Sequence, residues 1–193
     1  MDNVKKLRAC IDPIVLLSDN ELSIFSNAFE LVQVKKNDYF LKQGQVCNFL
    51  GLLLSGVMIY TKTVESGDEI TIHFAFDGDW VNNNLSRLSN SPSNIHIKAI
   101  EDCEMLVIKQ AAIENLYVEI PKLERLGRIL TERSFVRFVE QTIEFQTLTA
   151  KERYENLLRE FPEIIQRVQQ YHIANYLGVA PKSLSRIRKE IVS

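Results

Sequence analysis

A short stretch near the C-terminus carries basic and hydroxyl side chains at spacings that suit contact with nucleic acid. Between Pro181 and Lys189 there are four basic residues and no acidic residue. Arginine and lysine side chains reach guanine acceptors or phosphate oxygens, and a serine hydroxyl donates to either. The residues that we expect to contact DNA are Lys182, Ser183, Arg186, Arg188 and Lys189.

The residues around this basic stretch predict two helices joined by a tight turn. Gly178 can adopt the positive φ that closes such a turn, and Ala174 is small where two helices cross closely. Pro181 suits the first position of the second helix, where the missing amide costs nothing. Leu184 and Ile187, three residues apart, place one face of that helix in the core. A helix pair with a basic face is often only solvated surface, but these coinciding features favour a helix-turn-helix that binds DNA.

The charge of the chain is divided unevenly. The whole chain has a net charge of −2, whereas residues 149–193 hold eight Lys and Arg against five Asp and Glu. The tail is therefore basic and the rest of the chain is acidic. This asymmetry is expected when only one end of a protein meets phosphates.

The elements before the tail change their period along the chain. The segment from Val4 to Phe29 is predicted to be helical, with Ser18 as a cap. From Glu30 to Leu106 short alternating or β-branched runs follow, and glycines punctuate them about every ten residues. These runs predict a β-sandwich or barrel. The alternating runs are Ile70–Phe76 and Ile95–Ala99, and the apolar run is Leu52–Tyr60.

A long helix is predicted from about Pro121 to Gln146, with a broad apolar stripe. It either packs on its own β-domain or is shared between two subunits, and we favour a homodimer because the helix must also link two domains. Thr149 and Glu152 match a capping box and mark a break before the next helix. We therefore expect three parts: a sensor domain over 1–120, a linking helix over 121–147 and a DNA-binding domain over 148–193.

The chain resembles the CRP/FNR family of transcription regulators. The strongest match is IANYLGVAPKSLSRIRKE, and Gly44, Gly56 and the Gly78-Asp79 pair fall where the family's β-roll has glycine turns. The resemblance implies an α+β fold: an N-terminal antiparallel β-roll of the cyclic-nucleotide-binding type, a long dimerisation helix and a C-terminal winged helix-turn-helix. It also implies a homodimer that binds double-stranded DNA at a two-fold symmetric operator. Matched by residue, Lys182, Ser183 and Arg186 would read bases.

The cyclic-nucleotide site of that family is altered in this chain. Cyclic-AMP binders carry a Gly-Glu pair for the ribose and an Arg followed by Ser or Thr for the phosphate. Asn82-Asn83 stands near the first pair, and Ser93-Asn94 stands near the second. A neutral serine cannot supply the charge-assisted bond that a buried phosphate requires. Cyclic AMP and GMP are therefore not expected, and these four residues with Arg87 are candidates for binding another small-molecule effector, if the domain binds one at all.

Enzymatic and metal chemistry have little support in the sequence. The three cysteines are far apart and form no cluster, so we expect reduced, buried or partly buried thiols and no metal or other cofactor. A cupin-type metal enzyme would need more histidines than this chain offers, and His73 and His96 are expected to be surface or hydrogen-bonded residues. The remaining alternative is a module that uses its helical tail for protein or ligand contacts. Lacking a signal peptide or an apolar span, the chain is expected in the cytoplasm.

Overall fold

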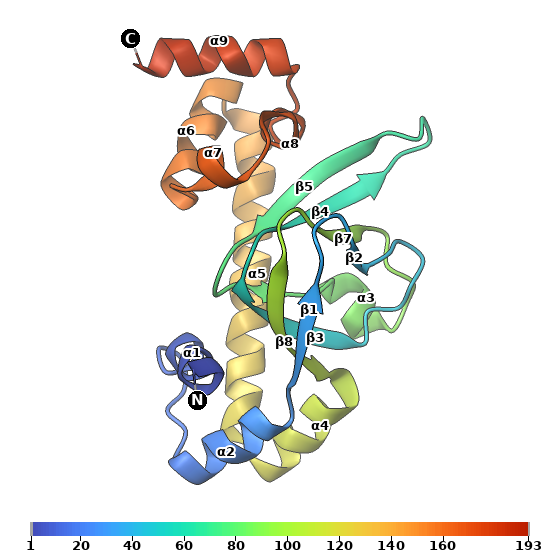
Figure 1. Ribbon diagram of the computed structural model, residues 1–193, viewed down its shortest axis with the longest axis vertical. Coiled ribbons are helices and arrows are strands. Elements are labelled where there is room, and N and C mark those ends of the chain that lie inside the picture. Colours follow the sequence, from blue (N-terminus) through green and yellow to red (C-terminus); the bar gives the residue numbers. More distant parts are fainter. Residues whose placement is uncertain (1, 193) are drawn as a thin grey trace.

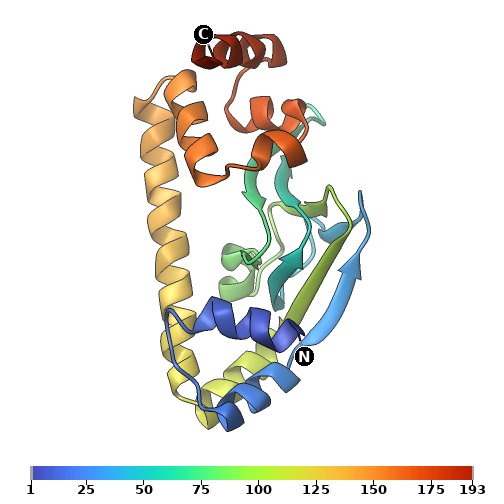
Figure 2. The ribbon, with the colours of Figure 1, turned by 60° about the vertical axis from the view of Figure 1, so that its left-hand side comes forward.

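The computed structural model describes residues 2–192 and shows an antiparallel β-roll between two groups of helices (Figure 1). One long helix, α5 (Lys122–Thr147), runs the length of the molecule beside the roll, as both views show (Figure 2). The predicted fold class, a β-roll followed by a long helix and a helical C-terminal part, is confirmed. Within the described residues, no helix is both long and apolar enough to cross a membrane.

The β-roll consists of two four-stranded antiparallel sheets. The first sheet has the order β1-β8-β3-β6, and the second has the order β2-β7-β4-β5. The strands of the first sheet are β1 (Glu30–Val34), β8 (Cys103–Lys109), β3 (Phe49–Ser55) and β6 (Trp80–Val81). Those of the second are β2 (Tyr39–Leu41), β7 (His96–Ala99), β4 (Met58–Thr63) and β5 (Glu69–Ala75).

An apolar core lies between the two sheets. The run Leu52–Tyr60 turns from the first sheet into the second at Gly56, whose φ is +108°. A Cβ atom there would lie 2.8 Å from the Asp102 carbonyl oxygen, so the turn requires glycine. Cys47 and Cys103 are buried in this core as free thiols, as predicted. Its other buried residues include Val34, Leu41, Leu53, Met58, Ile97 and Met105.

Strand β5 departs from the burial that its alternation suggests. Alternating sequences usually place the larger apolar residues inside. Ile70 and Ile72 are instead 41% and 36% exposed, while Thr71 between them is 3% exposed. The physical reason is tertiary, because helix α8 (Gln170–Tyr176) covers this part of the strand and contacts Thr71.

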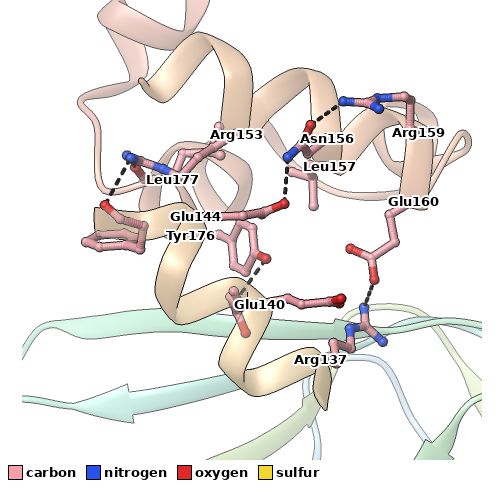
Figure 3. A pocket seen from close by; sticks show the side chains of 12 residues that line it. Arg137, Glu140, Glu144, Arg153, Asn156, Leu157, Arg159, Glu160, Tyr176 and Leu177 are labelled. Carbon is pink, nitrogen blue, oxygen red and sulfur yellow. Dashed lines mark hydrogen bonds and ion pairs between the residues drawn. The ribbon is translucent and has the colours of Figure 1, made fainter. Parts of the chain in front are cut away.

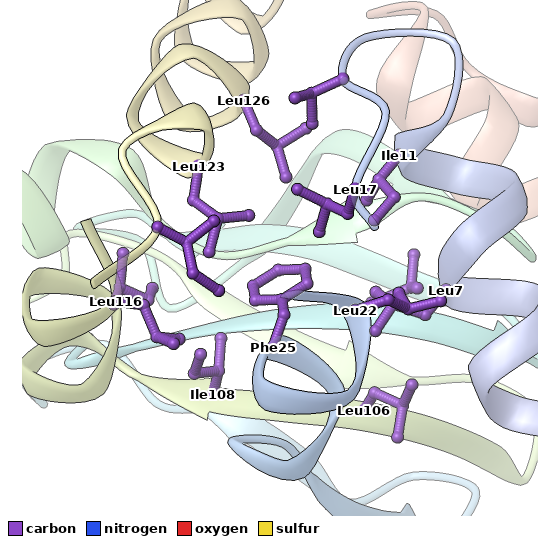
Figure 4. Packing of buried hydrophobic residues seen from close by; sticks show 14 of the residues in the cluster. Leu7, Ile11, Leu17, Leu22, Phe25, Leu106, Ile108, Leu116, Leu123 and Leu126 are labelled. Atoms are coloured by element: carbon purple, nitrogen blue, oxygen red, sulfur yellow. The ribbon is translucent and has the colours of Figure 1, made fainter. Parts of the chain in front are cut away.

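The helices at the base of the molecule form a second core around Phe25 (Figure 4). These helices are α1 (Asp2–Ile11), α2 (Asp19–Asn27), α4 (Gln110–Glu119) and the first turns of α5. Ser18 caps α2 in a capping box with Glu21, as its sequence predicts for the cap. Leu123 and Leu126 bury the start of α5 here, and each large apolar side chain contributes about 1.5–3 kcal/mol. This core fixes α5 against the roll.

The C-terminal part contains four helices within residues 148–192, which the structure describes. They are α6 (Ala150–Glu160), α7 (Ile164–Arg167), α8 and α9 (Pro181–Val192). Thr149 accepts a hydrogen bond from the Glu152 backbone and the Glu152 side chain bonds back, so the predicted capping box is confirmed. The described residues after Thr147 form no strands, so the wing that the resemblance implies is not among them.

Candidate nucleic-acid interface and effector cleft

Helices α8 and α9 form the predicted helix-turn-helix. Gly178 has a φ of +68°, and the Val179 amide donates to the Ala174 carbonyl over 3.0 Å to close the turn. Ala174 and Leu184 are completely buried where the two helices meet. Pro181 is the first residue of α9. The local signals in the sequence therefore correspond to the observed turn.

Helix α9 lies across one end of the molecule (Figures 1 and 2). Lys182, Ser183 and Arg186 are exposed and neighbour one another on its first turns. Lys189 is also exposed, one turn beyond Arg186. The side chain of Gln170 donates to the Ser185 hydroxyl over 2.7 Å and to the Pro181 carbonyl over 3.2 Å, so it ties α8 to the start of α9.

Arg188 lies apart from these residues. It is half-buried and close to Tyr154 of α6, where its charge opposes the rise that burial causes in the pKa of that tyrosine. The structure thus brings four of the five candidate DNA contacts onto one exposed side of α9 and turns Arg188 toward α6.

Three of the predicted effector residues bond to one another. The Asn83 side-chain amide donates to the Ser93 hydroxyl over 2.8 Å and to Asn94 Oδ1 over 3.3 Å. Asn83 also caps the short helix α3 (Asn84–Ser89). Asn83 and Ser93 are 6% and 2% exposed. They form a satisfied polar cluster that stabilises the loop, so a ligand would have to break these bonds to use them.

Asn82 and Arg87 lie in a different setting, because both line a cleft of about 380 Å³ between the roll and α5. The buried Oδ1 atom of Asn82 and the buried Nε atom of Arg87 have no hydrogen-bond partner among the described residues. The Arg87 guanidinium otherwise donates to Gln110 over 2.7 Å and to Asn84 over 3.1 Å. Buried polar atoms without partners are costly, so they mark a place where a polar ligand or water can bind.

The cleft contains further polar groups that the sequence did not indicate. Thr131, Ser134 and Arg137 reach it from α5, and Tyr60, His73 and Asp79 reach it from the roll. A polar Thr-x-x-Ser spacing inside the apolar stripe of α5 is the one signal that could have revealed them.

Burial dominates the electrostatics of this cleft. It lowers the pKa of His73 to about 3, with a smaller effect of Arg137, and it raises the pKa of Asp79. His73 is partly exposed, and its ring packs edge-on against Tyr60 with the ring centroids 5.2 Å apart. His96 does hydrogen-bond, accepting from the Gln43 amide over 3.0 Å, as predicted.

The loop at Ser93 and Asn94 is neutral and is bonded internally. Where the family has an arginine for the cyclic phosphate, the loop offers Ser93, whose hydroxyl donates to the Ile95 carbonyl over 2.7 Å. Arg87 lies in α3, and its guanidinium is held by hydrogen bonds to Gln110 and Asn84. Ser93 is neutral, so it supplies no charge-assisted bond to a phosphate.

A second cavity, of about 520 Å³, lies where α5, α6 and α8 meet (Figure 3). Arg137 pairs with Glu160 at 2.5 Å, and the Asn156 amide donates to Glu144 over 2.6 Å. Arg153 donates to the Leu177 carbonyl over 2.8 Å, next to Gly178. These bonds fix the helix-turn-helix to α5, whereas the buried Nε atom of Arg153 has no partner among the described residues.

The comparisons with known proteins agree with this architecture. Residues 31–119 match the family model of the cyclic nucleotide-binding domain. FixK2 from Bradyrhizobium japonicum has a similar structure, with a TM-score of 0.73, 17% identity and 84% of each chain covered. A putative CRP/FNR-family regulator from Eubacterium rectale gives a TM-score of 0.68 at 20% identity, covering 90% of this chain and 83% of that one. No curated protein matches the sequence.

These findings define the chain first as a protein with a cyclic nucleotide-binding domain and a helix-turn-helix. Its fold is that of the CRP/FNR regulators, and the resemblance predicted from the sequence is confirmed at this level. Its structural neighbours are mostly transcription regulators rather than enzymes.

Proposed function

We propose that this protein is a DNA-binding transcription regulator of the CRP/FNR type that acts as a homodimer in the cytoplasm. One observation carries the proposal: α9 follows a glycine-closed turn and presents Lys182, Ser183 and Arg186 on an exposed surface. In this proposal residues 1–120 form the sensor domain, residues 121–147 form the linking and dimerisation helix, and residues 148–193 form the DNA-binding domain.

DNA binding should show the salt dependence of phosphate contacts. On random duplex DNA at low salt, we expect binding that falls steeply as salt rises, by a log–log slope of about −0.9 for each phosphate neutralised. Filter binding or gel-shift titration over a salt series measures this slope. A protein that uses α9 for protein contacts would give no retained duplex, and the proposal would then fail.

The proposed dimer rests on the exposed apolar side of α5. Phe135 and Phe138 are 67% and 66% exposed, and Val136 and Ile143 are 53% and 54% exposed. Contiguous exposed apolar side chains of this size mark an interaction surface. A second copy of the chain fits it best, because two symmetric helices would cover the same residues and bring two α9 helices to one operator.

The effector of the sensor domain, if it has one, should not be a cyclic nucleotide. Titration calorimetry with cyclic AMP should give no measurable binding, because the loop at Ser93 lacks a cation for the phosphate and its hydroxyl is already bonded. The same titration with the Ser93→Arg variant provides a comparison in which the loop carries a cation. Micromolar affinity in the wild-type protein would contradict the prediction and assign the phosphate to Arg87 or Lys98.

A further inference from the structure

The helix-turn-helix and the sensor roll share one apolar core. Three apolar residues of the roll are at most 1% exposed: Val57 in the turn before β4, Ile59 in β4 and Phe74 in β5. The residues that cover them come from the C-terminal helices, chiefly Tyr154, Leu157, Ile164, Ile173, Ala174 and Leu177. The Phe74 ring lies 5.1 Å from the ring of Tyr176. Moving the C-terminal helices away would therefore expose large apolar side chains on both parts.

Asn175 of α8 bonds to the free edge of the second sheet. Its Oδ1 accepts from the Thr71 amide over 2.5 Å, and its Nδ2 donates to the Glu69 carbonyl over 3.2 Å. Among the described residues, strand β5 is the last strand of that sheet, so no neighbouring strand pairs with these backbone groups. One side-chain amide thus takes the place of a neighbouring strand, which links α8 to the hairpin at two points.

Charged and polar side chains add a second and a third attachment. Arg167 of α7 pairs with Glu101 at 2.7 Å and with Asp77 at 3.3 Å, both in turns of the roll. Gln141 of α5 donates to the Ile72 carbonyl over 3.2 Å and to the Tyr176 hydroxyl over 3.0 Å. The sheet edge, α5 and α8 are therefore joined around one point.

We propose that the β4–β5 hairpin sets the orientation of the DNA-binding helix α9, with Asn175 as the positioning residue that docks α8 on the hairpin. This inference rests on the proposed function, since it concerns how two α9 helices of a dimer meet one operator. Because α8 contacts both the hairpin and α9, a fixed α8 holds α9 across the end of the molecule (Figure 1). The docked arrangement is then the one that binds two half-sites.

The test compares Asn175→Ala with the control Glu65→Ala, which alters the exposed tip of the same hairpin. The probes are a duplex selected from a random library by the wild-type protein and the same duplex with one half-site scrambled. Asn175→Ala should weaken binding to the two-half-site duplex about tenfold, because a misdirected second α9 loses the effective concentration of a linked site. Binding to the scrambled duplex should change less than about twofold. Glu65→Ala should change neither.

Hydrogen exchange tests the docking without DNA. The Thr71 amide should be protected in the wild-type protein and should lose protection in Asn175→Ala, while the β4 amides keep theirs. Fast exchange of Thr71 in the wild-type protein would overturn the docking itself. Equal losses on both duplexes, or tighter binding by Asn175→Ala, would overturn the positioning role. If the wild-type protein selects no duplex, the proposed function fails, and this inference fails with it. The exchange experiment uses no DNA, so it distinguishes that outcome from failed docking.

Discussion

Phe135→Glu combined with Phe138→Glu should give a monomer that binds its operator at least about a hundredfold more weakly. Two carboxylates on the exposed side of α5 would have to be buried against a second copy, which is unfavourable without partners. Losing the partner removes the linked second half-site, and such linkage raises affinity by about 10²–10⁴-fold. Light scattering gives the mass, and titration of a two-half-site duplex gives the affinity.

The choice of these residues follows from the structure. Ile129 and Val136 both belong to the apolar stripe of the predicted helix, and Val136 is 53% exposed. Ile129 instead packs partly against the core at the base of the molecule, so a glutamate there would also destabilise the fold. Val118→Glu is the matched control, because this valine is 84% exposed on α4. A wild-type protein that is monomeric at micromolar concentration would contradict the dimer outright.

Arg186→Ala should cost about 1–3 kcal/mol on the preferred operator and relax selectivity at one base pair in each half-site. Arg186 is the best candidate for base reading because a guanidinium can bond guanine O6 and N7 together, whereas a lysine is a point charge. It is exposed on α9 beside Lys182 and Ser183. Competition titrations against operators with single base changes measure the selectivity directly.

Lys189→Ala provides the contrast, since this residue lies further along α9 and is expected to meet phosphate. It should weaken all sequences about equally and reduce the salt slope by about one unit. If Arg186→Ala instead loses as much affinity for random DNA as for the operator, Arg186 does not read bases. Two-fold symmetry adds a spacing of about 10 base pairs between half-site centres, which the selected duplexes will show.

The features that the sequence predicted correctly depend on residues close together in the chain. The caps at Ser18 and Thr149, the turn at Gly178 and the long helix from Lys122 all follow from spacings of a few residues. Hydrophobic period and turn chemistry are local, so they appear in the sequence directly. The broad division into a helical start, a β-domain and a helical tail followed in the same way.

The contacts that shape the two cavities and the docking of α8 could be seen only in the tertiary structure. Asn175 meets Thr71 across 104 positions of the chain, and the cleft joins Asn82 and Arg87 to Thr131 and other residues of α5. Thr71 is buried and Ile70 is exposed because of what packs on the strand, which no alternation can specify. The hydrogen bond between the side chains of Asn83 and Ser93 is likewise visible only in the structure. By itself the sequence determined the elements and the basic face of α9. Only the folded chain decided which side chains meet, because those meetings depend on distant segments whose packing leaves no local pattern.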